Sequence, residues 1–430
     1  MPGGSTGCRR HPIPESFLST QSQLKNGDIP MKKPPATHWL PDDGLTGTLV
    51  GRAWVPGPVP GPSVIVLRLD GVYDLSAHFA TMSDLLDAAD PVAQVRAAPG
   101  RRVGSIDQLM HDSGVQSDDP QVLRLLAPCD LQVIKAAGVT FAASLIERVI
   151  EEQARGDAAQ ADAVRRQVVE LLGGDLAAIR PGSPQAMQLK ALLIDKGLWS
   201  QYLEVGIGPD AEVFTKAPVL SSVGSGAQIG IHPGSAWNNP EPEIVLAVNS
   251  RGDTVGASLG NDVNLRDFEG RSALLLGKAK DNNASCAIGP FIRLFDASYS
   301  LDDVRRCTVS LQVEGLDGFA LQGSSSMAQI SRDPLDLVAQ TLGAHHQYPD
   351  GVMLFLGTLF APTQDRGQPG SGFTHQLGDV VHISSPQLGR LVNDVNHCDR
   401  VAPWTFGLRA FYANLSARGL RVQTADSTAP

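Results

Sequence analysis

The sequence predicts an α+β protein with a β-rich core, and three observations support this class. The 430 residues exceed one ordinary domain, which favours a large domain with a smaller companion. The chain contains 44 glycines and 30 prolines but only 5% aromatic residues, a balance typical of many turns and strands. Beyond residue 213, short apolar runs alternate with turn residues. An all-helical bundle is therefore disfavoured.

Residues 1–40 are rich in Gly, Ser, Pro and Lys and show no sustained apolar period. We expect a disordered extension here, in which Met31 is a candidate natural start. A small N-terminal α/β domain is expected at residues 41–125. Its first strands should be 47–54 and 63–69, because both are apolar and flank the turn-rich Pro-Gly-Pro-Val-Pro-Gly-Pro stretch.

The helix of this small domain is expected at residues 81–89, with Ser83 as its cap. The larger domain is placed at residues 126–425, and it should begin with two amphipathic helices. Apolar residues recur at helical spacing in 144–155, and a second such stretch runs from 159 to 172 before two glycines. These two helices together predict a helical lid.

The rest of the larger domain should be mainly strands. Four apolar runs carry this prediction, namely 243–248, 308–313, 352–356 and 380–383.

Charge and composition narrow the classes of partner. Hydrophobic residues make up 42% of the chain and the formal net charge is -10, which argues against nucleic acid or an anionic membrane as the main partner. No apolar run approaches the roughly 18 residues that span a bilayer, and a secretion signal is not evident, so we expect a cytoplasmic protein. The five cysteines lack CxxC spacing and are read as reduced thiols.

Three carboxylates are candidates for one metal site. Glu241 and Glu243 alternate along an extended strand, so their side chains point to the same side, two rises of ~3.3 Å apart. Asp262 follows the next apolar run, and an antiparallel return would place it opposite the pair. Oxygen-only ligands favour a hard ion such as Mg²⁺, with Mn²⁺ as the alternative. Taken alone, Glu-x-Glu could also be the exposed face of a surface hairpin.

These motifs together resemble the fumarylacetoacetate hydrolase family. The resemblance covers residues 126–420 and includes Glu-x-Glu, Asn-Asp-x-x-x-Arg-Asp from Asn261, the Ile-Gly-Pro that ends at Pro290, Gly-Asp-Val-Val from Gly378, and Trp-Thr-Phe-Gly from Trp404. It implies a mixed β-sandwich or roll as the catalytic domain, with the three carboxylates as metal ligands. It also implies a homodimer or a dimer of dimers.

Within the family, the chain most resembles the dehydratases of 2-keto-3-deoxy-D-xylonate (2-dehydro-3-deoxy-D-pentonate). The shared stretches are Gly-Val-Thr-Phe from Gly138, Ala-Lys-Asp-Asn-Asn from Ala279, and Ile-Ser-Arg-Asp-Pro from Ile330. Family hydrolases that cleave carbon–carbon bonds carry a histidine where this chain has Ser144. The implied reaction is therefore loss of water from the 2-keto-3-deoxy sugar acid, giving 2,5-dioxopentanoate (α-ketoglutarate semialdehyde) in oxidative pentose catabolism.

The resemblance also implies roles for six further residues. Lys280 would support the substrate carboxylate or enolate, and Glu147 or Glu151, one helical turn apart on the expected lid, would be the acid–base. The substrate-binding candidates are Asn282, Thr358 and Ser144. A solvated helix face for the two glutamates, or a satisfied turn hydroxyl for Thr358, is the plainer alternative.

Other functions stay open at this point. The same metal chemistry would assist an acylpyruvate-type hydrolase or an oxaloacetate decarboxylase of this family. A non-catalytic, metal-stabilised binding protein is the alternative of another class. A sugar-acid dehydratase with an enolase-type barrel is disfavoured, because regular alternation of strands and helices is absent.

Overall fold

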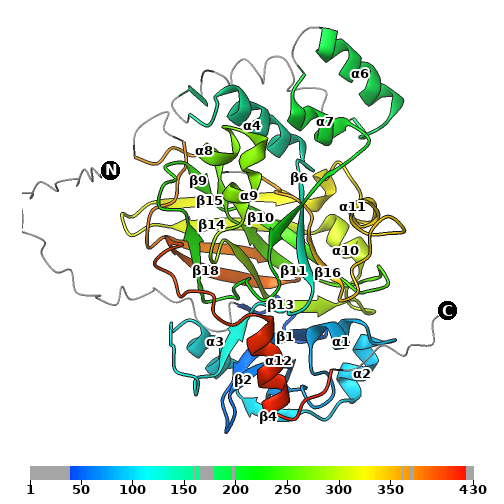
Figure 1. Cartoon of the computed structure of the whole chain (residues 1–430), viewed down its shortest axis with the longest axis vertical. Helices are drawn as coiled ribbons and strands as arrows, with labels where there is room; N and C mark the ends of the chain where they lie inside the picture. The colour runs from blue at the N-terminus through cyan, green and yellow to red at the C-terminus, as the bar shows by residue number, and fades with distance from the viewer. Residues whose placement is uncertain are drawn as a thin grey trace, which may run out of the picture. The chain divides into compact units, whose positions relative to one another are not determined.

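Two β-sheets form the core of the structure, a computed structural model (Figure 1). It describes residues 39–157, 160, 161, 163, 179–195, 199–360, 362–367 and 372–422. These residues all lie in one compact unit, Pro34–Pro430. Residues 1–38 and most of 159–172 fall outside the described part of the chain, so the extension and the second lid helix stay predictions.

The larger sheet has eleven strands among the described residues. In spatial order they run β4-β3-β2-β1-β13-β11-β10-β16-β6-β7, and β5 pairs with β1 off this path. Their bounds are β1 Leu49–Val55, β2 Gly61–Arg68, β3 Gly71–Asp74, β4 Arg101–Gly104, β5 Arg124–Leu126, β6 Val133–Gly138, β7 Glu212–Ala217, β10 Pro242–Val248, β11 Thr254–Asp262, β13 Cys286–Leu294 and β16 Val352–Phe355.

The smaller sheet has the order β15-β14-β17-β18-β8, and a separate pair is formed by β9 and β12. The bounds are β8 Gln228–Ile231, β9 Asn238–Asn239, β12 Asn264–Leu265, β14 Thr308–Glu314, β15 Ala320–Ser326, β17 Val380–Ser385 and β18 Gly389–His397. In β14 every second residue is buried, as expected for a strand with one face on a core. By contrast, all seven residues of β10 are buried, because this strand is covered on both faces. The two sheets share one hydrophobic core.

Short helices cover the sheets. Figure 1 shows α4, α6, α7 and α8 gathered at one end of the larger sheet, and α1, α2, α3 and α12 around its N-terminal strands at the other end. Their bounds are α1 Met82–Leu86, α2 Pro91–Ala97, α3 Ile106–Ser113, α4 Ala142–Gln153, α6 Pro184–Asp195, α7 Gln201–Ile207, α8 Arg266–Glu269, α9 Leu276–Lys280, α10 Leu301–Arg306, α11 Pro334–Thr341 and α12 Leu408–Ala417. No helix in the described ranges is both long and apolar enough to cross a bilayer.

The structure confirms the α+β class and most of the expected strands. β1 and β2 pair in antiparallel register, with Val50 opposite Val66, as expected for the strands that flank the Pro-Gly stretch. The division into 41–125 and 126–425 stays a prediction. Strands from both parts join one sheet, because β1 also pairs with β13, where Leu49 lies opposite Arg293.

The expected cap of the first helix is wrong. Thr81, not Ser83, is the N-cap of α1, since its side chain accepts from the Asp84 amide at 2.9 Å and the Asp84 carboxylate accepts from the Thr81 amide. Ser83 lies inside the helix and its hydroxyl donates to the carbonyl of Asp350 at 2.9 Å. A capping box satisfies two amides at once, which a single hydroxyl at position 83 does not.

Close packing behind the metal candidates predicts a large effect of a small substitution. Gly260 of β11 lies opposite Glu243, and a Cβ there would overlap the ring of Phe355 and the side chain of Val245. We therefore expect Gly260→Ala to destabilise the protein by about 1–3 kcal/mol in denaturant unfolding. Gly277→Ala in α9 is the control, because a Cβ there meets nothing within 4 Å. Equal unfolding free energies for the two variants would contradict this packing.

Candidate active site

The β10–β11 hairpin brings the three predicted ligand residues together. Pro242 pairs with Asn261, so Glu241 lies opposite Asp262, and the Asp262 amide donates to the Glu241 carbonyl at 3.1 Å. Glu243 is two residues further along and shares the face of Glu241. The three carboxylates are each 1% exposed, and one oxygen from each lies within 4.8 Å of the others.

A turn after β16 fixes the orientation of Glu243. The Gly357 amide donates to Glu243 Oε2 at 2.7 Å, and the Thr358 hydroxyl lies 3.2 Å from Oε1. Gly357 has φ +100°, and a Cβ on it would overlap the Thr140 hydroxyl, so both conformation and space require glycine. Thr358 therefore contacts Glu243, one of the candidate metal ligands, and also lines the cavity around them.

Basic side chains surround the carboxylates. The Lys280 ammonium, at the end of α9, lies 2.5 Å from Glu241 Oε2 and 3.0 Å from Asp262 Oδ2. Lys216 of β7 is fully buried, with its ammonium 2.8 Å from Asp262 Oδ1. Arg148 of α4 donates to Glu241 Oε1. The cluster is therefore a buried, charge-balanced array rather than an exposed acidic face.

The carboxylates differ in their affinity for a proton. Burial opposes ionisation of Glu241, but Lys280 and Arg148 outweigh it and lower its pKa to about 2. Burial, together with the charges of Asp262 and Glu241, raises the pKa of Glu243 well above its ordinary value of 4.5. A divalent cation would relieve this repulsion, and three oxygen donors within 4.8 Å of one another suit a hard ion. The residues present therefore fit Mg²⁺ or Mn²⁺.

Glu151 belongs to an ionic network beside the triad. Its carboxylate lies 2.6 Å from Arg148 and 3.0 Å from Arg266, and Arg148 also lies 3.1 Å from Glu269. Burial raises the pKa of Glu151 despite these two cations. Glu147, the other acid predicted to lie on a lid, is more exposed, at 13%, and lies 4.0 Å from Arg266.

A carboxylate that sequence reasoning missed faces the triad. Glu212 at the start of β7 lines the same small cavity as Glu241, Glu243 and Lys280. It lies opposite Gly138 of β6, and a Cβ on Gly138 would overlap the Glu212 carboxylate. Burial and the nearby Glu269 raise the pKa of Glu212 to about 7. Such a group can both accept and donate a proton near neutral pH.

The structure divides the predicted residues into two groups. Those that line the cavity are Glu241, Glu243, Asp262, Lys280, Thr358 and Ser144. Those outside its lining are Glu147, Glu151 and Asn282. The side-chain amide of Asn282 instead donates to the Lys278 carbonyl at 2.9 Å. None of the described lining residues is a histidine, and Ser144 donates to the Phe141 carbonyl at 2.9 Å. The free volume is only about 10 Å³, close to the space one water occupies.

The residues that sequence reasoning missed follow the local periodicity of β7 and α4, which groups side chains on one face but does not specify what that face contacts. Glu212, Phe214 and Lys216 alternate along β7, so all three face one side of the strand, toward the site. On α4 the residues that line the cavity are Ser144 and Arg148, which lie one helical turn apart. Glu147 does not share their side of the helix and does not line the cavity.

The raised pKa of Glu212 predicts a pH-dependent stability. Because its pKa of about 7 lies above the ordinary 4.5, the folded protein holds this proton more tightly than the unfolded chain. Its contribution to stability is therefore full below pH 4.5 and is lost as the pH rises through 7. Glu212→Gln keeps the neutral form, so its melting temperature should rise relative to the parent over this interval in chelator-treated protein. A constant difference would show that Glu212 does not titrate there.

Residues 202–396 match the family model described as fumarylacetoacetate (FAA) hydrolase C-terminal. The mixed α+β fold is also that of a solved 2-keto-3-deoxyarabinonate dehydratase, with a TM-score of 0.54 at 20% identity over 81% of this chain and 98% of that one.

Two relatives of the chain are named as dehydratases. The chain is 26% identical over 323 residues to the "Probable 2-keto-3-deoxyxylonate dehydratase" of Haloferax volcanii, covering 75% of this chain and 91% of that protein. It is 32% identical over 187 residues to the "2-dehydro-3-deoxy-D-arabinonate dehydratase" of Saccharolobus solfataricus, covering 43% of this chain and 58% of that one.

A solved structure has the same fold. It is a 2-keto-3-deoxy-D-arabinonate dehydratase complexed with magnesium and 2,5-dioxopentanoate. The TM-score is 0.52 at 19% identity, over 81% of this chain and 99% of that one.

Proposed function

We propose that this protein is a metal-dependent dehydratase that converts 2-keto-3-deoxy-D-xylonate into 2,5-dioxopentanoate. The observation that carries the proposal is the cavity in which Glu212 and Lys280 flank three metal-candidate carboxylates. Elimination of water needs an acid–base group and a charge that stabilises an enolate, and it needs no nucleophile. The names of the two relatives support the same substrate class.

Glu241, Glu243 and Asp262 would hold the cation, which we propose is Mg²⁺, with Mn²⁺ as the alternative. When bound, it would polarise the 2-keto oxygen and so acidify the C3 protons. The lysine contributes a second positive charge. Lys280 would bind the substrate carboxylate or the developing enolate oxygen, because its ammonium already lies between two of the three acids.

The acid–base is proposed to be Glu212. Its ionised form would take a C3 proton, and the C4 hydroxyl would leave with that proton as water, which gives the C3–C4 double bond. Loss of a C5 proton and protonation at C3 then give a 4,5-enol, which tautomerises to the C5 aldehyde. One water leaves in total. Glu147 or Glu151 remains the second proposal for this role, through movement of α4.

Substrate entry requires side chains to move. A free volume of about 10 Å³ is far too small for a five-carbon acid. Arg148 of α4 donates a hydrogen bond to Glu241, and Ser144 of the same helix lines the cavity. We propose that α4 is part of a lid whose displacement breaks the Arg148–Glu241 contact and admits the sugar acid, with Ser144 and Thr358 then contacting it.

A substrate panel tests the proposed reaction. Purified protein with Mg²⁺ would be incubated with 2-keto-3-deoxy-pentonate epimers, an acylpyruvate and oxaloacetate, while carbonyl products are followed. We expect turnover of a pentonate and negligible hydrolysis of the acylpyruvate, because no histidine is found among the described lining residues to activate water. Preferred cleavage of the acylpyruvate, or decarboxylation of oxaloacetate, would identify one of the alternative reactions of this family. Absence of any turnover would favour the non-catalytic binding protein.

The homodimer or dimer of dimers expected from the resemblance stays a prediction. Light scattering at micromolar concentration tests it, and a monomer mass would contradict it.

A further inference from the structure

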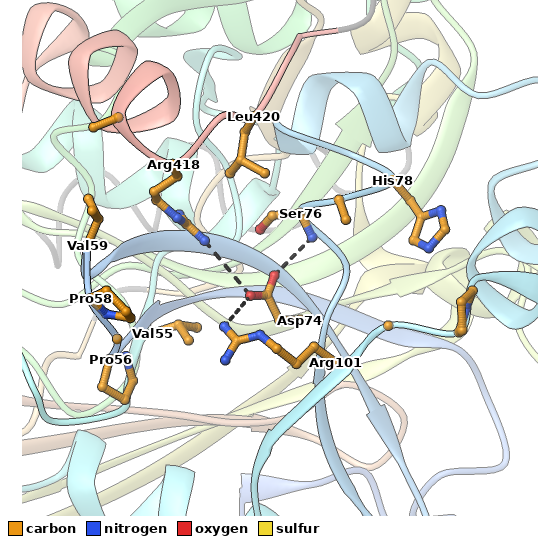
Figure 2. A pocket seen from close by; sticks show the side chains of 15 residues that line it. Val55, Pro56, Pro58, Val59, Asp74, Ser76, His78, Arg101, Arg418 and Leu420 are labelled. Carbon is orange, nitrogen blue, oxygen red and sulfur yellow. Dashed lines mark hydrogen bonds and ion pairs between the residues drawn. The ribbon is translucent and has the colours of Figure 1, made fainter.

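A second, much larger cavity lies away from the acidic triad. Its free volume is about 640 Å³, within the range of small-molecule sites. It is lined by the β1–β2 loop, the end of β3, the start of β4 and the end of α12, at the end of the larger sheet opposite α4 and α8 (Figures 1 and 2).

Three charged side chains meet at this cavity. Figure 2 shows Arg418 and Arg101 approaching Asp74 from opposite sides. The Arg101 guanidinium lies 2.9 Å and the Arg418 guanidinium 3.8 Å from Asp74 Oδ2. Two arginines against one aspartate leave this lining with an excess positive charge, in a chain whose formal net charge is -10. A local positive site in an acidic protein favours an anion.

The walls of the cavity are held in place before any ligand binds. Arg418 donates to the Pro62 carbonyl and to the Ser63 hydroxyl, each at 2.6 Å. In the proline-rich β1–β2 loop, the Gln121 side chain bonds the amide and the carbonyl of Gly57 at 3.3 and 3.2 Å. Prolines fix φ, so this loop presents a stiff apolar surface. A preformed wall lowers the entropy cost of binding.

One hydroxyl in the lining has no partner among the described residues. Ser76 is 4% exposed, and its Oγ makes no hydrogen bond, although its amide donates to Asp74 Oδ1 at 2.9 Å. A buried hydroxyl without a partner costs free energy, so such groups are usually satisfied. A ligand atom in the cavity would satisfy Ser76 Oγ.

The donors and acceptors define the chemistry of the ligand. Arg101 is 64% exposed and uses only one terminal nitrogen on Asp74, so its other N–H groups can hold a carboxylate or a phosphate. Asp74 accepts hydrogen bonds, which suits hydroxyl groups on the ligand. The apolar wall offers area for a carbon skeleton. In a purely structural role, ion pairs would hold β3, β4 and α12 together, and only the contacts between Asp74 and the two arginines would be required. Such a role would explain neither the cavity nor the hydroxyl that has no partner.

We propose that this cavity is a binding site for a hydroxylated organic anion, separate from the acidic triad and independent of the proposed reaction. Arg101 and Arg418 would bind the carboxylate or phosphate group, with Ser76 as an additional hydrogen-bonding partner. Asp74 would accept from ligand hydroxyl groups.

Calorimetric titration of the full chain tests this site. The probes are D-gluconate, ribose 5-phosphate, inorganic phosphate and uncharged xylitol, which separate carboxylate from phosphate recognition and charge from hydroxyl recognition. We expect one-to-one binding of gluconate or ribose 5-phosphate. Arg101→Gln should weaken this binding by about 10-fold or more, as expected for loss of a charge-assisted hydrogen bond.

Arg102→Gln is the matched control, because Arg102 is the next residue on β4 and donates to the Asp70 carbonyl outside the cavity. It should change affinity by less than about twofold. Binding should persist in Glu243→Gln, which separates this cavity from the triad. Neither arginine variant should alter turnover. The proposal is overturned if neither gluconate nor ribose 5-phosphate binds at millimolar concentration, if xylitol binds as well as they do, or if the two arginine variants behave alike.

Discussion

Glu243→Gln is expected to abolish metal-dependent turnover and to lower Mg²⁺ affinity by more than about 100-fold. Glu243 supplies one of three carboxylate oxygens that lie within 4.8 Å of one another. An amide keeps the acceptor for the Gly357 amide, whose bond to Glu243 is 2.7 Å, but it removes the negative charge. The turn should therefore persist while the cation site fails.

The same variant should not destabilise the metal-free protein. Burial and two neighbouring carboxylates raise the pKa of Glu243, so the folded state binds its proton more tightly than the unfolded chain. This contribution is full below the ordinary pKa of 4.5 and is lost as the pH rises. The melting temperature of Glu243→Gln relative to the parent should therefore increase with pH in chelator. Mg²⁺ should stabilise the parent and leave the variant unchanged.

Glu314→Gln is the control, because Glu314 lies on β14 and outside the cavity lining. It should retain both metal affinity and turnover. Unchanged Mg²⁺ affinity in Glu243→Gln would show that this carboxylate is not a ligand.

Glu212→Gln should lower kcat by roughly 10²–10⁴ while leaving Mg²⁺ affinity nearly unchanged. Glu212 lines the cavity of the triad, and its pKa of about 7 suits proton transfer near neutral pH. Rapid-reaction kinetics and calorimetric titration of the metal separate the two effects. Loss of metal binding would instead make Glu212 part of the cation site.

The lid acids provide matched comparisons. Glu147→Gln should keep most of its kcat, because Glu147 lies outside the cavity lining. Glu151→Gln should likewise keep most of its kcat, because Glu151 also lies outside the cavity lining, where it pairs with Arg148 and Arg266. A large loss of kcat in either variant at unchanged stability, with full activity in Glu212→Gln, would return the acid–base role to the lid.

Sequence alone could predict the centre of the site because its geometry is local. Glu241, Glu243 and Asp262 lie on one hairpin, where alternation and antiparallel return determine which side chains meet. Lys280 was recognised through the motif around it. The strands could also be predicted, because buried residues alternate with less buried ones in β14 and β10 is apolar apart from Glu243.

Residues that reach the site from distant segments could not be predicted in the same way. Glu212 meets the triad because β7 pairs with β6 and β6 pairs with β16, a set of long-range contacts that no local pattern specifies. Similarly, the sequence left open whether Glu151 is an acid–base or part of a solvated helix face, and no local pattern assigns a role to Arg148. Packing of α4 against α7 and α8 buries them, and their charges then form ion pairs with Glu241 and Arg266.

Product analysis from 2-keto-3-deoxy-D-xylonate tests the central claim most directly. The protein would be incubated with this acid and Mg²⁺, and remaining substrate, aldehyde and carbon dioxide would be measured by NMR and mass spectrometry, with a chelator-treated sample beside it. We predict one 2,5-dioxopentanoate for each substrate consumed, with loss of one water, no carbon dioxide, and no reaction in chelator. Two shorter carbon fragments, release of carbon dioxide, or equal turnover in chelator would contradict the metal-dependent dehydration.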